Sequence, residues 1–237
     1  MNAHLRHGQF TAPIARARLL SGSMQTRLPV DARRTRLVAA ALNVAEQVGI
    51  EGLTVRRVAE EAGVPRGAVY YCFESKEILV TAMGEGLIVD ITGALHAALN
   101  AAVDACELTG TRGLRELLHS GLSAVWPIVE RSADRQLLSY EIKTYLLRHR
   151  ALGSEQAAAL ASGQYRIRDT EAFEFFSRAA EHTGTRWLEP VDSVARFGMA
   201  TVDGLILRWL VDRDDIAVIA ALDDLAGVIA AKAVERP

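Results

Sequence analysis

The sequence predicts an all-α protein, and three observations lead to that prediction. Apolar residues recur at the i, i+3, i+4, i+7 spacing of one helix face, most clearly in residues 37–48. Pro127 is the only proline in residues 66–189. Alanine and leucine dominate, and runs that alternate β-branched and polar residues, as strands do, are absent. We therefore expect a small helical domain at residues 31–80 and a larger one at residues 81–237.

Four short helices are expected from Arg33 onward, separated by glycine, proline and capping residues. Glycine supplies the left-handed backbone that ends a helix, and a Thr or Ser hydroxyl accepts a free N–H at the start of the next. The residues in these roles are Gly49, Thr54, Gly63, Pro65 and Ser75. The third helix must be very short, because it lies between Pro65 and Phe73.

The larger domain also has helical periodicity throughout, and Pro127 is expected to kink the helix that contains it. The expected helices span residues 84–107, 112–131, 134–149, 155–183, 191–212 and 215–234. Residues 1–30 have no sustained period and predict a disordered basic tail. The alternative is a basic arm that enters a DNA minor groove, and Met24 is an alternative start.

Charge and composition restrict the function. Residues 1–80 contain eleven Lys/Arg and seven Asp/Glu, a net +4, whereas the remainder carries −6. A polyanionic partner is therefore expected at the front of the chain. Two cysteines are too few for a disulfide scaffold, and neither a signal peptide nor a 20-residue apolar run occurs. We expect a cytoplasmic protein with no membrane partner.

Signatures of catalysis are missing from the sequence. The six histidines are dispersed, and no HExxH, GxSxG, CxxC or Gly-rich phosphate loop occurs. We expect no enzyme, no cofactor and no metal site. A scaffold protein that contacts other proteins or the nucleoid is the other alternative to a regulator.

Two short helices joined by a glycine-containing turn predict a helix-turn-helix between Thr54 and Phe73. Here the stretch "RRTRLVAAALNVAEQVGIEGLTVRRVAEEAGVPRGAVYYCFESKEILVTAM", from Arg33 to Met83, resembles the TetR family of one-component transcriptional regulators. The stretch "DGLILRWLVDRDD", from Asp203 to Asp215, looks like the penultimate helix of many such proteins. The resemblance implies a three-helix DNA-binding domain and a helical ligand-sensing and dimerisation domain.

The resemblance also implies roles for individual residues. Arginine in the first turn of the second helix or early in the third reads a guanine edge or binds phosphate, and Lys76 clamps a phosphate. The expected DNA-binding residues are Thr54, Arg56, Arg57, Arg66, Gly67, Ala68, Tyr70, Tyr71 and Lys76. For Tyr70 the alternative is a core position. Pro65, Cys72 and Glu74 depart from the family pattern, and for Cys72 a packing role competes with a redox role.

Helical bodies of this kind commonly hold a pocket between helices. Residues that combine apolar bulk with a polar tip are the candidates for its lining: His119, Leu122, Trp126, Tyr140, Tyr145 and Met199. For each of them ordinary core packing is the alternative. The apolar majority predicts a hydrophobic small-molecule effector.

Reading two half-sites of DNA requires a homodimer. A stripe on the helix at 191–212, with residues of the preceding helix, is expected to form its interface: Phe173, Phe176, Ala180, Ala195, Gly198, Val202, Leu205 and Trp209. Packing within one chain is the alternative.

The function we expect is that of a repressor released from a palindromic operator by a small apolar molecule. An activator or a ligand-independent DNA-binding protein of the same fold is the alternative.

Overall fold

The structure is a computed structural model that describes residues 30–237, with the side chains of residues 30, 88–92, 94 and 164 left undescribed. The expected tail at residues 1–30 therefore lies, apart from Val30, outside the described residues.

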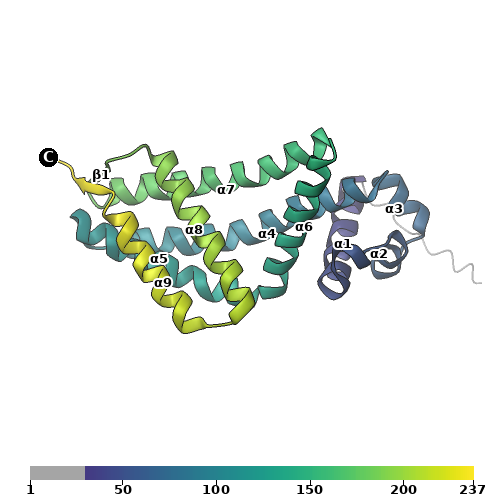
Figure 1. Ribbon diagram of the computed structural model, residues 1–237, viewed down its shortest axis with the longest axis horizontal. Coiled ribbons are helices and arrows are strands. Elements are labelled where there is room, and N and C mark those ends of the chain that lie inside the picture. Colours follow the sequence, from purple (N-terminus) through teal and green to yellow (C-terminus); the bar gives the residue numbers. More distant parts are fainter. Residues whose placement is uncertain (1–29) are drawn as a thin grey trace, which may run out of the picture.

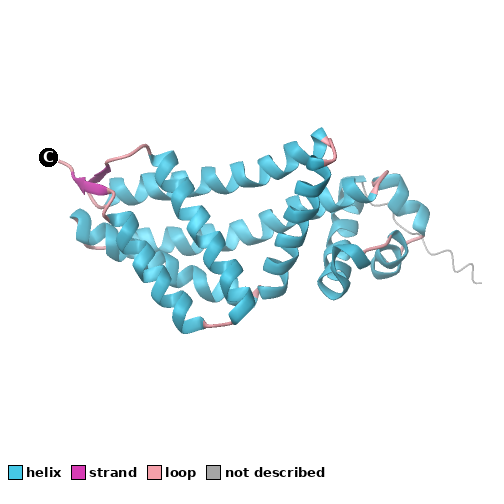
Figure 2. Cartoon of the chain, viewed as in Figure 1, coloured by secondary structure: helices cyan, strands magenta, loops and turns pink. Residues whose placement is uncertain are grey.

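The described residues are almost entirely helical, which confirms the all-α prediction (Figures 1 and 2). In chain order the elements are α1 (Val30–Gly52), α2 (Val55–Ala62), α3 (Arg66–Cys72), α4 (Lys76–Ala105), α5 (Gly110–Arg131), α6 (Ala133–Ala151), α7 (Glu155–His182), β1 (Thr185–Trp187), α8 (Val191–Asp212), α9 (Asp215–Ala230) and β2 (Ala233–Glu235). No helix among the described residues is long and apolar enough to cross a membrane.

Helices α1–α3 and the first turns of α4 form a headpiece at one end of the molecule (Figure 1). Its core contains Leu37, Val58, Val69 and Phe73, each at most 2% exposed. These residues come from α1, α2, α3 and the position just after α3, so burying them holds the three helices together.

The first helix ends later than the sequence predicts. Gly49 does have the expected left-handed φ of +68°, but one further turn follows it up to Gly52. The Oε2 atom of Glu141 accepts the Ile50 N–H at 2.8 Å and thereby caps this restarted turn. The cap belongs to α6, 91 residues away, so no local pattern indicates it.

Helices α4–α9 form the body. Helix α4 is one continuous helix from the headpiece into the body, so the helix expected at residues 84–107 is the second part of the helix that starts after Ser75. Helix α5 continues through Pro127. Helices α8 and α9 run side by side across one face of the body (Figure 1). The core of the body includes Leu114, Leu117, Val194 and Ile229.

The two strands were not expected. Residues 185–187 and 233–235 pair as an antiparallel ribbon, far from the headpiece (Figure 2). The predicted last helix, to residue 234, therefore ends at Ala230 instead. Three-residue strands are too short to give a period of two, and the paired residues lie 46 to 50 positions apart in the sequence.

Candidate DNA-binding surface and effector cavity

The turn between α2 and α3 is built from a hydroxyl cap and a left-handed glycine. Thr54 Oγ1 accepts the Arg57 N–H at 3.3 Å at the start of α2. Gly63 ends α2 with φ +63°, and the next N–H, of Val64, donates to the Ala59 carbonyl at 3.0 Å. This local geometry matches the sequence prediction, and it sets the direction in which α3 leaves the turn.

The outer face of α3 is open to solvent because its inner face is anchored. Tyr70 and Tyr71 are 60% and 72% exposed, so the alternative of a core position for Tyr70 is wrong. Arg66 and Gly67 are exposed, and a Cβ placed on Gly67 would meet no atom within 4 Å. Ala68 is half-buried. The phenol groups of Tyr70 and Tyr71, the guanidinium of Arg66 and the exposed backbone at Gly67 therefore lie on one solvent-accessible surface.

The basic residues around α3 make only weak contacts within the chain. Arg56 Nε lies 3.4 Å from Glu60 Oε1 in an exposed pair, and Arg57 Nη1 donates to the Gly52 carbonyl at 3.3 Å. Lys76 Nζ donates to the Glu51 carbonyl at 3.4 Å. Exposed contacts of this kind contribute little, so these cations can exchange them for a phosphate.

Two arginines that support this surface were not singled out from the sequence. Arg34 Nη1 donates to the Cys72 carbonyl at 3.1 Å, and its guanidinium lies over the Phe73 ring. Arg36 donates to the Ala62 carbonyl at 2.7 Å. Both satisfy carbonyls that the ends of α2 and α3 leave free. Cys72 itself is half-buried against the headpiece core, as the packing interpretation has it.

The body contains a cavity of about 320 Å³ between α4, α5, α6, α7, α8 and α9. This is near the lower end of the range for small-molecule pockets. Most of its wall is apolar, and the wall includes Leu87, Leu99, Val125, Phe175, Met199 and Ile229. Polar side chains in the wall come from three helices: His96 and Asn100 of α4, Gln136 and Ser139 of α6, and Arg168, Glu171, Glu174 and Arg178 of α7.

Two of the six residues expected to line a pocket, Leu122 and Met199, do line this cavity. His119 does not, because its Nδ1 lies 2.9 Å from Asp223 Oδ1 in a surface pair between α5 and α9. Trp126 does not either, since it is buried edge-on against Trp209 with ring centroids 5.1 Å apart.

The two tyrosines on the list also lie outside the cavity wall. Tyr140 donates its hydroxyl to the Asp203 carbonyl at 2.7 Å, while burial, and then the charge of Asp203, raises its pKa. Tyr145 stacks on His149 beside the headpiece core. Helical spacing finds apolar residues with polar tips, but it does not show which of them border a void.

Most residues expected at the dimer interface are buried within the single chain, so they cannot contact a second chain, and the prediction is wrong for them. Five members of the list lie in the cores of the body: Phe176, Ala180, Ala195, Gly198 and Trp209. Val202 lines the cavity, and Leu205 is partly buried against Trp126 and its neighbours. Phe173 is 40% exposed.

A different apolar stripe is exposed on α8 and continues onto α9. On α8 it consists of Phe197, Ala200, Gly204, Leu207 and Val211, and on α9 of Ile216, Ile219, Ala220 and Val228. Ile216 and Val211 are 84% and 78% exposed. Helix α8 thus has apolar residues on two faces. The residues expected at the dimer interface lie on the inner face.

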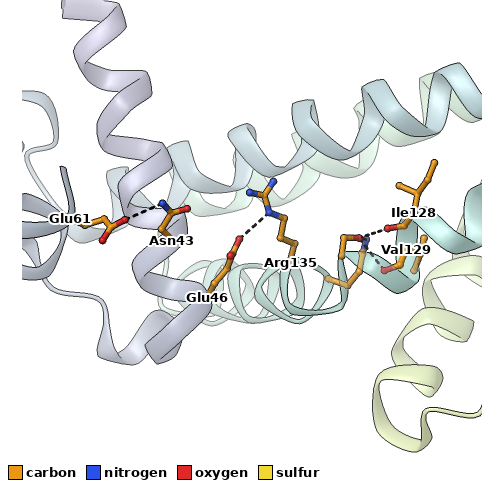
Figure 3. A network of polar contacts seen from close by, with 8 residues as sticks. Asn43, Glu46, Glu61, Ile128, Val129 and Arg135 are labelled. Carbon is orange, nitrogen blue, oxygen red and sulfur yellow. Dashed lines mark hydrogen bonds and ion pairs between the residues drawn. The ribbon is translucent and has the colours of Figure 1, made fainter.

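Helix α6 joins the cavity to the headpiece. Gln136, Ser139 and Ile142 line the cavity, whereas Arg135 and Glu141 contact α1. Figure 3 shows Arg135 reaching Glu46, 3.0 Å away, and Asn43 bonded to Glu61 of α2. Polar contacts therefore run from α6 through α1 to the helix-turn-helix.

Comparison with known proteins agrees with this arrangement. Residues 37–83 match the model of the bacterial regulatory proteins of the tetR family. The headpiece is thereby identified as a TetR-family DNA-binding domain. The chain is 29% identical to the HTH-type transcriptional repressor KstR2 of Rhodococcus jostii over 189 aligned residues. The alignment covers 73% of this chain and 91% of that protein.

Two further matches extend over the body as well as the headpiece. The HTH-type nicotine-responsive transcriptional repressor HdnoR of Paenarthrobacter nicotinovorans is 23% identical over 183 residues, 77% of this chain and 86% of that one. A solved transcriptional regulator from Rhodococcus sp. Rha1 superposes with a TM-score of 0.61 at 25% identity, over 86% of this chain and 99% of the other.

Proposed function

We propose that this protein is a dimeric TetR-family transcriptional repressor that binds an imperfect palindromic operator in the cytoplasm and leaves it when a small, largely apolar effector occupies the cavity. The exposed face of α3 is the observation that supports this most strongly. Arg66, Tyr70 and Tyr71 point away from a buried anchor, as a helix that enters the major groove requires. Thr54, Arg56, Arg57, Gly67, Ala68 and Lys76 complete the proposed DNA contacts.

The relatives support the direction of the response. The two named relatives are called repressors, and one of them is called nicotine-responsive. The reported relatives are named for transcriptional regulation and not for catalysis. We therefore favour repression with release by a ligand over activation and over ligand-independent binding.

The exposed stripe on α8 and α9 supports the dimer. On α8 the stripe residues follow one another at intervals of 3, 4, 3 and 4 positions. This is the spacing of the apolar residues at which two paired helices contact each other. A Cβ placed on Gly204 would meet nothing within 4 Å, so a second chain can approach the backbone closely there. The partner that fits best is a second copy, because a two-fold axis places the same stripe against itself.

Selection of DNA from a random pool with the purified protein tests the proposal. The recovered sequences should form an imperfect palindrome with half-site centres about one helical turn apart, or a multiple of it. Binding should weaken steeply with salt and should exceed binding to random DNA by a factor of about 10³ or more. Recovery of no motif, or of a single unpaired half-site, would contradict it.

A further inference from the structure

A cluster of partly buried charged side chains connects α6, α7 and α8 beside the cavity. Asp203 of α8 accepts from Arg168 Nη2 at 2.8 Å and from Lys143 Nζ at 3.5 Å. The side chains of these three residues are only 13–23% exposed. The hydroxyl of Tyr165 donates to the same carboxylate at 3.3 Å.

Within the described residues, this cluster has two cations for one carboxylate. Burial, followed by the charge of Arg168, lowers the pKa of Lys143 against the pull of Asp203. Burial alone would raise the pKa of Asp203, but the two cations outweigh it and hold the pKa below its usual value. The surplus positive charge follows from the geometry, since Lys143 and Arg168 both face the single carboxylate of Asp203. Such a charge is costly to bury unless an anion is brought to it.

Arg168 is the member of the cluster that also lines the cavity. A guanidinium has five N–H donors, and one nitrogen is committed to Asp203, so others remain for a group inside the cavity. Gln136 and Ser139 line the cavity on α6, and Lys143 follows Ser139 one turn later on the same helix face. The amide of Gln136 and the hydroxyl of Ser139 therefore lie toward the same end as Arg168.

Arg178, the second arginine in the wall, lies in a different setting. It is bonded to Asn100 and lies 3.7 Å from Asp104, so its charge already has a carboxylate partner. Its side chain is 44% exposed, which places it at the solvent edge of the wall. It is a matched control on the same helix.

We propose that the effector is an amphipathic monoanion whose carboxylate is bound by Arg168, with Gln136 and Ser139 as neutral donors, while its apolar body fills the cavity beside Leu99, Phe175 and Met199. This deepens the proposed function and rests on the cavity being the effector site. A carboxylate at Arg168 neutralises the surplus charge and accepts the charge-assisted hydrogen bonds that a guanidinium makes best.

Three probes that differ only at the head group test this proposal: decanoate, 1-decanol and decylamine, each used below its micelle-forming concentration. Calorimetry on the full-length protein should show that decanoate binds about tenfold or more tightly than decanol, and that decylamine binds most weakly. The preference for decanoate over decanol should vanish in Arg168→Gln and persist in Arg178→Gln. It should rise in Asp203→Asn, where Arg168 loses its internal partner. Because the preference is a ratio within one variant, changes in stability cancel from it.

Equal binding of decanoate and decanol by the wild-type protein, or an undiminished preference in Arg168→Gln, would overturn the proposal. So would a failure of all three probes to bind. If decanol bound as tightly as decanoate and still displaced the operator, the cavity would remain the effector site and only the anionic class would be wrong. A protein that selects no palindrome from random DNA would instead refute the proposed function.

Discussion

The headpiece and the body of this protein use helices in opposite ways. In the headpiece the functional side chains point outward from short helices, each with one buried face, as the buried Val69 and the exposed Tyr71 on α3 illustrate. In the body the proposed effector cavity lies inside, between long helices that are apolar on more than one face. Apolar spacing therefore identifies the surface of the headpiece, but it leaves the inner and outer faces of α8 undecided.

The strongest test of that difference is to break the exposed face of α8. Leu207→Asp should convert the dimer to a monomer and lower operator affinity by about two orders of magnitude, because each half-site then binds alone. Light scattering and a binding titration measure both effects. Leu147→Asp on α6 is the control, since the two leucines are 48% and 52% exposed. A dimer that survives Leu207→Asp would move the interface elsewhere.

A change in the headpiece should alter sequence preference and leave the assembly intact. Arg66→Ala should cost about 1–3 kcal/mol per half-site and relax one base position in each, because a bidentate contact to guanine is lost. Lys76→Ala should instead weaken all sequences alike and flatten the salt slope by about one per half-site. Repeating the random-pool selection with each variant separates the two roles. Arg150→Ala, also exposed, should do neither.

The junction between the two regions gives a third test. Glu141→Ala removes the cap on the Ile50 N–H, so α6 loses one of its contacts with α1. The variant should still bind both operator and effector, but each should weaken the other less, with about 1 kcal/mol of coupling lost. Operator titrations with and without saturating effector measure this coupling. Glu130→Ala on the exposed face of α5 is the control, and unchanged coupling in Glu141→Ala would exclude this route.

The smallest expected effect concerns the buried charges of the body. Lys143→Met should raise the free energy of unfolding by about 1 kcal/mol at pH 7, because a surplus buried cation is removed. The pKa of Lys143 is lowered on folding, so the unfolded chain holds that proton to higher pH than the folded chain does. Wild-type stability should therefore rise with pH, and the advantage of the variant should shrink toward pH 10. Urea unfolding at pH 7 and pH 9.5 checks the sign.

Much of the fold followed from local chemistry. Thr54, Gly63 and Ser75 mark helix ends through their own hydroxyls or backbone angles, and the structure has those ends where they were expected. The bounds of α5, α6, α7 and α8 agree with the prediction to within two residues, whereas distant partners change the ends of α1 and α9. Glu141 extends α1, and the pairing of residues 185–187 with 233–235 shortens α9.

The cavity was harder to predict than the DNA-binding surface for a physical reason. A cavity is the space that the surrounding side chains leave empty, and that space depends on how six helices pack against one another. Leu122 and Met199 were found because they are apolar and central, whereas Arg168 was missed because a charged residue on a helix normally lies in solvent. An arginine, a lysine and an aspartate on three different helices leave no signal in the spacing of any one of them.

The continuity of α4 has a mechanical consequence. The helix holds Lys76 at its first turn and the cavity residue Leu95 five turns later, about 28 Å along its axis. A stiff rod of that length enlarges small movements, so a tilt of about 5° around Leu95 would carry Lys76 roughly 2.5 Å sideways. That displacement is close to the whole length of a hydrogen bond. Under the proposed function, an effector that tilts α4 slightly at the cavity would therefore move Lys76 away from the phosphate that it is proposed to bind.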